Sequence, residues 1–183
     1  MPSSLTLYRA NMLPSSDIGN VTAETQFKDG RGSLPLQLQL PSNGSLANKA
    51  FRVRVSGRVS TTTNTTFELK AYFGITSTIS SNTLIYDVGA QTVNNTTSSF
   101  EIWLDCFWSA DANSITGRGT GQMANNVSGP SALNNTPLSA NPNRDSSTTL
   151  ASGTTYGLTL TGQFGGSSAG NHATIDNFDL ESA

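Results

Sequence analysis

The chain has 183 residues, of which 35% are hydrophobic and 12% are charged, and its formal net charge is −2. This length is typical of one domain, and the residues that replace the missing apolar and charged ones are Ser, Thr, Asn and Gly, which favour strands and tight turns over helices. The weak charge and the scattered Arg and Lys residues argue against binding to nucleic-acid phosphates.

Cys106 and His172 are the only cysteine and the only histidine. A disulfide within the chain is therefore impossible, and most zinc sites and most His-based catalysis are excluded. We predict no catalytic residues, no metal and no cofactor, and expect that the chain is not an enzyme. Residues 1–9 show no basic start followed by an apolar run, and no apolar stretch approaches the roughly 20 residues of a membrane helix, so we expect neither a secretory signal nor a membrane span.

The first part of the chain differs in pattern from the rest. Residues 1–33 mix polar residues with isolated apolar ones, and we interpret them as an N-terminal arm preceding a β domain over residues 34–183. From there, repeated alternation of apolar and polar residues predicts strands that bury one face. In chain order the expected strands cover residues 34–40, 51–59, 66–74, 83–86, 99–108, 115–123, 156–164 and 173–180. The second and third are expected to form a hairpin, with a bulge at Gly57.

The strand at 99–108 has an unusual outer face. Its apolar face carries Phe100, Ile102, Leu104, Cys106 and Trp108. Trp103 and Phe107 fall on the opposite face, and Arg52 and Arg54 point outward from the strand at 51–59. These four residues form our candidate interface, because exposed aromatic and Arg side chains are enriched where proteins bind partners. The alternative is that both aromatic side chains are buried beneath the arm or a long loop.

The strand at 115–123 is rich in glycine, is expected to pair with the strand at 99–108, and would leave space for facing aromatic rings. Residues 124–153 contain little but Asn, Ser, Pro, Thr and Gly, and we interpret them as a long loop. Eight strands without helices favour a two-sheet antiparallel β-sandwich of the jelly-roll type, with an N-terminal arm. An immunoglobulin-like sandwich is the nearest competitor.

The strands at 51–59, 67–74 (ending in Tyr-Phe-Gly), 101–109, 115–123 and 156–165 together resemble the jelly-roll capsid decoration, or cement, proteins of tailed bacteriophages. The resemblance implies a structural virion protein that binds the major capsid protein on the outer capsid surface and stabilises the shell. It also implies a homo-oligomer, with a trimer favoured. Because the composition looks extracellular while no secretory signal is found, we expect a virion protein that is made in the host cytoplasm. No catalytic residues come with the resemblance, and from charge and composition we expect neither a nucleic-acid nor a membrane partner.

Three other functions stay open. A carbohydrate-binding module, or a phage receptor-binding or tail protein, would read a glycan with the 124–153 loop and exposed aromatic rings. A hydrolase would need paired carboxylates, and a Ca²⁺ site would use the same hard oxygen ligands. The available clusters are Asp105 with Asp111, and Asp176 with Asp179 and Glu181. Aspartates that cap their own backbone turns explain these clusters equally well.

Overall fold

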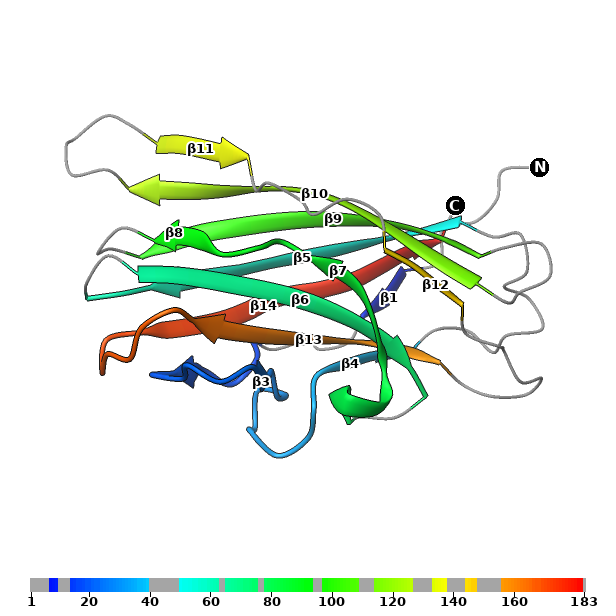
Figure 1. Ribbon diagram of the computed structural model, residues 1–183, viewed down its shortest axis with the longest axis horizontal. Coiled ribbons are helices and arrows are strands. Elements are labelled where there is room, and N and C mark those ends of the chain that lie inside the picture. Colours follow the sequence, from blue (N-terminus) through cyan, green and yellow to red (C-terminus); the bar gives the residue numbers. More distant parts are fainter. Residues whose placement is uncertain are drawn as a thin grey trace.

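The computed structural model describes residues 7–9, 14–39, 50–62, 65–75, 78–93, 97–108, 114–126, 133–137, 144–147 and 156–182. These residues form fourteen strands and one short 3-10 helix, Ile79–Ser81, which precedes β7. Every pairing between the strands is antiparallel, and the strands make two sheets that face each other (Figure 1). The all-β, two-sheet sandwich expected from the alternating pattern is therefore confirmed.

The larger sheet, sheet A, has eight strands in the order β1-β14-β5-β9-β10-β11, with β2 also on β14 and β12 also on β10. Its strands are β1 (Leu7–Arg9), β2 (Ile18–Gly19), β5 (Ala50–Ser60), β9 (Ser98–Trp108), β10 (Ser114–Asn126), β11 (Leu133–Pro137), β12 (Arg144–Ser147) and β14 (His172–Ser182). Two of them, β11 and β12, lie within the segment expected to be a long loop. Residues 127–132, 138–143 and 148–153 of that segment lie outside the described residues.

The smaller sheet, sheet B, has six strands in the order β3-β13-β6-β7, with β4 also on β13 and β8 also on β6. Its strands are β3 (Thr25–Gln26), β4 (Gln37–Gln39), β6 (Thr65–Gly74), β7 (Thr83–Asp87), β8 (Gln91–Val93) and β13 (Gly157–Phe164). Each of the eight expected strands has a counterpart, namely β4, β5, β6, β7, β9, β10, β13 and β14.

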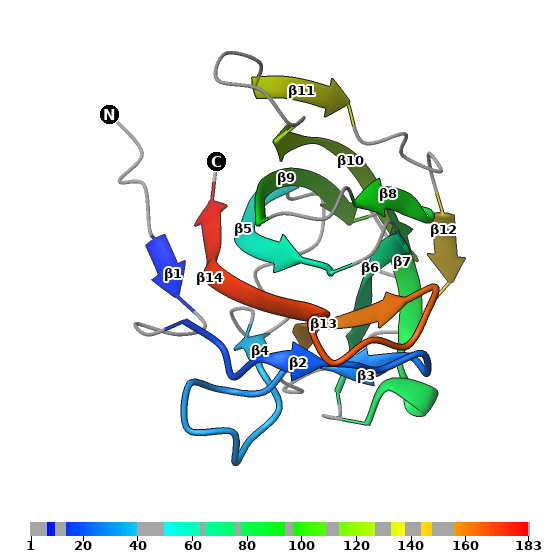
Figure 2. The same ribbon diagram turned by 90° about the vertical axis from the view of Figure 1, so that its left-hand side faces the viewer.

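The last two long strands complete both sheets. In sheet B, β13 lies between β6 and the early strands β3 and β4; in sheet A, β14 lies between β5 and the early strands β1 and β2. The end-on view shows the chain passing from one layer to the other between these strands (Figure 2). Such crossing connections between two antiparallel sheets are the jelly-roll arrangement.

The expected hairpin between the second and third strands is wrong. β5 pairs with β9 and β14 in sheet A, whereas β6 pairs with β7, β8 and β13 in sheet B. Both strands alternate between buried and more exposed residues. Alternation records only that one face is buried, so it is satisfied as well by two strands in opposite sheets as by two paired strands.

The expected bulge lies on the neighbouring strand. β5 keeps its alternation through Gly57, and Val59 is still buried. The register shift instead falls between Ile175 and Asn177 on β14, opposite Gly57, so Asp176 is the extra residue. The shift changes which positions face the core: the buried apolar residues of β14 are Ala173 and Ile175 before it, and Phe178 and Leu180 after it. An inserted residue that reverses the phase of one strand is the defining property of a bulge.

The core fills the space between the sheets. Phe67 of sheet B packs against Phe100 of sheet A and against Phe164, with ring centroids 6.1 and 5.2 Å apart. Cys106 is fully buried, and burial raises the pKa of its thiol, as is typical of an unreactive core cysteine.

The described part of the expected N-terminal arm packs on the sandwich. Phe27 is fully buried and Ile18 nearly so, and both belong to the main core. Ser15 exchanges two hydrogen bonds with the backbone of Ile175: its N–H donates to the carbonyl (2.7 Å), and its hydroxyl accepts from the N–H (2.8 Å). From residue 14 onward, the arm is thus fastened to β14 and helps to close the core.

A polar cluster fastens the same segment to sheet B. Glu24 Oε1 accepts hydrogen bonds from the hydroxyls of Tyr72 (2.6 Å) and Thr161 (2.7 Å). Lys70 Nζ lies 3.6 Å from Glu24 Oε2 and 3.4 Å from Glu68 Oε2. Burial, together with the charge and hydrogen bond of Asp87, raises the pKa of Glu68. The cluster therefore holds more carboxylate than its single lysine neutralises.

Candidate binding face

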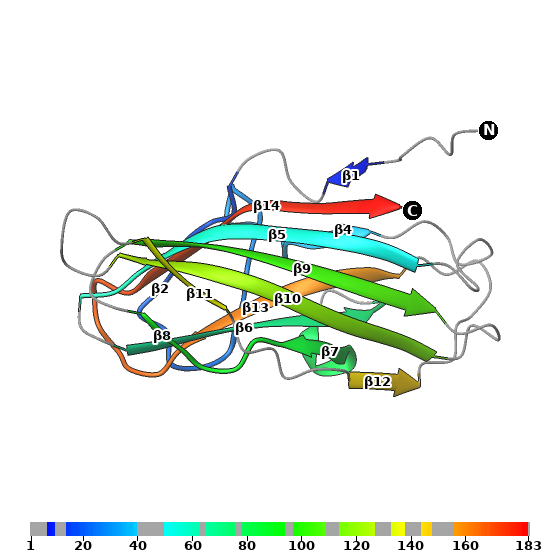
Figure 3. The ribbon, with the colours of Figure 1, turned by 90° about the horizontal axis from the view of Figure 1, so that it is seen from above.

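The outer face of sheet A presents side chains in rows that cross the strands, which lie side by side in Figure 3. One row consists of Asp179 (β14), Arg54 (β5), Trp103 (β9) and Thr120 (β10). The next row consists of Asn177, Ser56, Glu101 and Gln122 on the same strands. Antiparallel pairing brings directly opposed side chains close enough to interact, so each row acts as a contact unit.

Trp103 lies beneath two guanidinium groups. The Cζ atoms of Arg54 and Arg52 are 5.1 and 5.9 Å from the centre of the Trp103 ring. Both distances are within the range of a cation–π interaction. Arg54 is the direct cross-strand neighbour of Trp103, and Arg52 is one row away. The indole is half-buried, and the two arginines cover its ring.

Each of these arginines also pairs with a carboxylate. Arg52 donates two hydrogen bonds to Asp105, at 2.7 and 3.2 Å, and Arg54 Nε donates to Glu101 Oε1 at 2.6 Å. Exposed ion pairs contribute only about 0–1 kcal/mol each. Their effect here is geometric, because the carboxylates hold the guanidinium planes over the indole. Arg52 remains 53% exposed and Arg54 43% exposed, so both are available to a partner.

The structure therefore brings together three of the four residues of the candidate interface, Arg52, Arg54 and Trp103. The position of Phe107 on β9 is described, in register with Ala50 and Thr116, but its side chain lies outside the described residues. The arginine cover of Trp103 was not foreseen. The sequence signal for this contact is the Arg-x-Arg spacing of Arg52 and Arg54 on one strand. It indicates a contact with Trp103 only when the partner strand and its register are known.

A shallow hollow opens beside this patch, where the bulge of β14 meets β5 and β9. Its volume is about 290 Å³. Its polar lining residues are Arg54, Ser56, Ser99, Glu101, Gln122, Asp176 and Asn177. The bulge places both Asp176 and Asn177 on the outer face, where Asp176 accepts two hydrogen bonds of 2.9 Å from Arg58 and the Asn177 amide donates one of 2.9 Å to the Ser56 hydroxyl.

The carboxylate clusters noted in the sequence do not gather into one site in the described part of the chain. Asp176 pairs with Arg58, whereas Asp179 is buried in register with Arg54. Asp111 lies outside the described residues, as does the side chain of Glu181. Among the residues that the structure describes, no group of three or more His, Cys, Asp or Glu side chains is placed to hold a metal ion.

His172 is an exposed residue at the start of β14, and its Nδ1 contacts Asp17 Oδ2. The other carboxylate oxygen of Asp17 accepts the N–H of Ala173 at 3.0 Å. This pair fastens the N-terminal segment at β2 to sheet A. It lines a second hollow of about 370 Å³, together with Arg58, Ser60, Thr97 and Thr174.

The described residues contain no helix with the length and hydropathy of a membrane span.

No protein-family model and no curated protein matches this sequence. Among solved structures, the chain is similar to arcelin-5, a lectin-like defense protein from Phaseolus vulgaris, at 9% identity and a TM-score of 0.41 over 99% of both chains. It is also similar to a Lotus tetragonolobus seed lectin isoform, at 9% identity and a TM-score of 0.36 over 98% of both chains. Similarity at this level indicates neither a shared ligand nor a shared function.

Proposed function

We propose that this chain is a structural binding protein of a virion, which docks through the outer face of sheet A on the outside of a capsid shell. The observation that carries the proposal is the Trp103 indole held beneath Arg52 and Arg54. Trp and Arg are the residue types that contribute most to protein–protein binding, particularly when they cluster. The sequence resemblance to capsid decoration proteins supports the choice of a shell as the partner.

The cover over Trp103 favours a protein partner over a sugar at this point. A sugar ring stacks on an open aromatic face, whereas two guanidinium groups already lie over this ring. A protein partner can instead add its own carboxylates and carbonyl oxygens to the exposed edges of Arg52 and Arg54. The docked protein would be a homo-oligomer, with a trimer favoured, and would stabilise the shell without catalysing a reaction.

The test is co-sedimentation of the purified protein with DNA-free shells assembled from the major capsid protein of the same virus. Wild-type protein is expected to bind saturably. Trp103→Ala and Arg54→Ala are each expected to weaken binding by about tenfold or more, as hot-spot truncations do. Arg31→Ala is the matched control, because Arg31 is an exposed arginine in the turn after β3 and outside sheet A.

Two results would overturn the proposal. One is a wild-type protein that does not sediment with the shells at any concentration tested. The other is equal weakening by Arg31→Ala and Arg54→Ala, which would indicate non-specific attraction between charges. Light scattering on the same samples measures the oligomer before and after docking.

A further inference from the structure

A hollow with the hydrogen-bonding groups of a sugar-binding site lies on the outer face of sheet A, next to the Arg52–Trp103 patch. Four strands build it: Arg54 and Ser56 come from β5, Ser99 and Glu101 from β9, Gln122 from β10, and Asn177 from β14. Its floor is the backbone of Gly57 with the edge of Phe100 below it, since a Cβ at position 57 would lie 2.6 Å from Phe100 Cζ. The hollow is thus a product of the fold, lying where the bulge of β14 meets β5 and β9.

The lining offers both donors and acceptors of hydrogen bonds. Because the Asn177 amide nitrogen donates to Ser56 Oγ, the Asn177 carbonyl oxygen and the Ser56 hydroxyl hydrogen remain available to a ligand. Ser99 and Gln122 have no side-chain hydrogen bond to any other described residue. A ligand hydroxyl both donates and accepts, so several of these groups can each satisfy one hydroxyl of a polyol ring.

The charges in the hollow cancel in pairs. Arg54 is bound to Glu101, and Asp176 is bound to Arg58, which stands beside the hollow. A charged ligand would have to break one of these pairs or would meet a carboxylate of like sign. No net charge therefore favours an acidic or a basic ligand.

We propose that this hollow binds a neutral saccharide, through the side chains of Ser56, Ser99, Gln122 and Asn177. Its volume of about 290 Å³ is at the small end of ligand pockets and suits one or two sugar rings. No aromatic side chain among its lining residues faces the ligand, because Phe100 is turned into the core. Binding is therefore weak, with a Kd in the range of about 1 mM.

The experiment is a titration of the ¹⁵N-labelled full chain, free of any shell, followed by backbone amide shifts. The probes are methyl α-glucoside, methyl α-mannoside, methyl β-galactoside and N-acetylglucosamine, with sodium glucuronate as the charged comparison. At least one neutral probe is expected to give saturable shifts centred on Ser56, Ser99, Gln122 and Asn177. Gln122→Ala is expected to raise the Kd by about tenfold.

Thr120→Ala is the matched control, because Thr120 lies on the same strand and face as Gln122 but does not line the hollow. It should bind the probe as the wild type does. The proposal is overturned if no neutral probe produces saturable shifts in the hollow up to about 100 mM, a concentration far above the expected Kd. It is also overturned if Gln122→Ala binds normally, or if glucuronate binds more tightly than every neutral probe. Because no shell is present, failure of this titration leaves the docking proposal standing, and the reverse also holds.

Discussion

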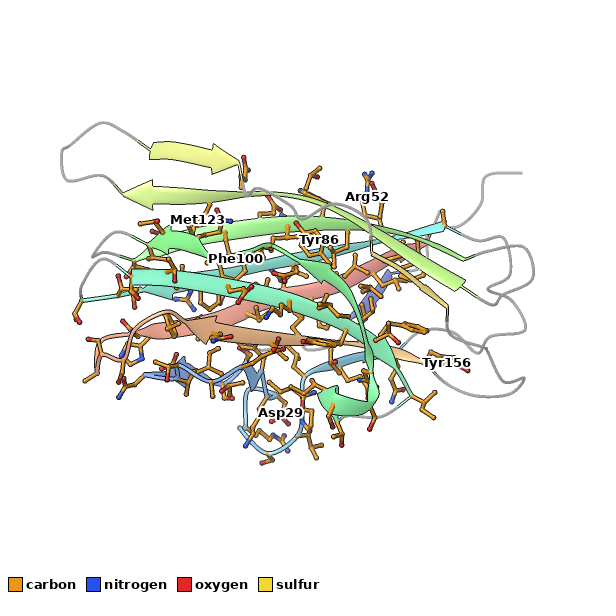
Figure 4. The ribbon with its side chains drawn as sticks, viewed as in Figure 1. Asp29, Arg52, Tyr86, Phe100, Met123 and Tyr156 are labelled. Atoms are coloured by element: carbon orange, nitrogen blue, oxygen red, sulfur yellow. The ribbon has the colours of Figure 1, made fainter. Side chains whose placement is uncertain are left out.

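Gly119 on β10 stands directly against the ring of Tyr86 on β7, across the core from it: a Cβ at position 119 would lie 1.8 Å from Tyr86 Cε2. Tyr86, labelled in Figure 4, is almost completely buried. The glycines of β10 were expected to leave space for aromatic rings on the paired strand. The residue paired with Gly119 on β9 is Leu104, and the ring that uses the space belongs to the opposite sheet.

Gly119→Ala is therefore expected to destabilise the fold by about 1–3 kcal/mol or more, because the methyl group overlaps a ring that has no room to move. Urea denaturation followed by tryptophan fluorescence measures the loss. In a Tyr86→Leu background the same substitution should cost less, since the smaller side chain relieves the overlap. An equal cost in both backgrounds would show that the contact is not the cause.

Removal of the Tyr86 hydroxyl is expected to be neutral or stabilising by up to about 1 kcal/mol, because this group is buried and finds no hydrogen-bond partner among the described residues. Burial raises the pKa of Tyr86 to about 12, above the value of about 10 expected in the unfolded chain. The folded state thus prefers the protonated form, and stability is lost as the pH rises from about 10 to about 12. The unfolding free energy of the wild type should fall more steeply over this range than that of Tyr86→Phe; parallel curves would contradict this.

Phe27 and Leu34 test whether the N-terminal segment is part of the core. Phe27→Ala is expected to cost about 3–5 kcal/mol, the usual cost of truncating a buried phenylalanine. Leu34→Ala is the matched control in the same segment, since Leu34 is 66% exposed, and its effect should stay within about 0.5 kcal/mol. Thermal unfolding of the two variants decides the matter, and similar small losses in both would mean that the segment is only loosely attached.

Glu68→Gln is expected to raise Tm slightly at neutral pH. Burial and the neighbouring Asp87 raise the pKa of Glu68, so ionisation of this carboxyl opposes folding. Protonated Glu68 contributes to the stability of the fold below its pKa in the unfolded chain, about 4.3. This contribution is lost as the pH rises through the higher pKa of Glu68 in the folded state. The difference in Tm between the variant and the wild type should therefore vanish near pH 4. A variant less stable than the wild type at pH 7 would show that the contact with Lys70 outweighs this repulsion.

The strands could be predicted from the sequence because each long strand buries one face and repeats with period two. The partners of those strands could not, since alternation is the same for paired strands and for strands that face each other across a core, as β5 and β6 show. Ile18 and Phe27 were missed as core residues because each stands alone among polar neighbours in a short strand or beside one. Such isolated residues have no period to detect.

At the binding face, the outward position of the key residues could be predicted from the sequence, but the register of the strands that bring them together could not. The exposure of Arg52 and Arg54 follows from alternation, as does the outward position of Trp103. Their contact depends on β5 pairing with β9 in one particular register. The hollow depends on the extra residue in β14. Its signal in the sequence is the pair of polar residues Asp176 and Asn177 between Ile175 and Phe178, which reverses the alternation and was missed.

The central positions of β13 and β14 also affect how the chain is made. Until a ribosome has released these last strands, β5 and β6 each lack a neighbour, and the N-terminal strands have nothing to pair with. Unpaired strand edges in an incomplete sandwich are sites of aggregation and proteolysis. A product truncated before β13 would keep the pairing of β5 with β9 and of β6 with β7, but it would expose an unpaired edge of β5 and of β6, and it is therefore expected to aggregate or to be degraded.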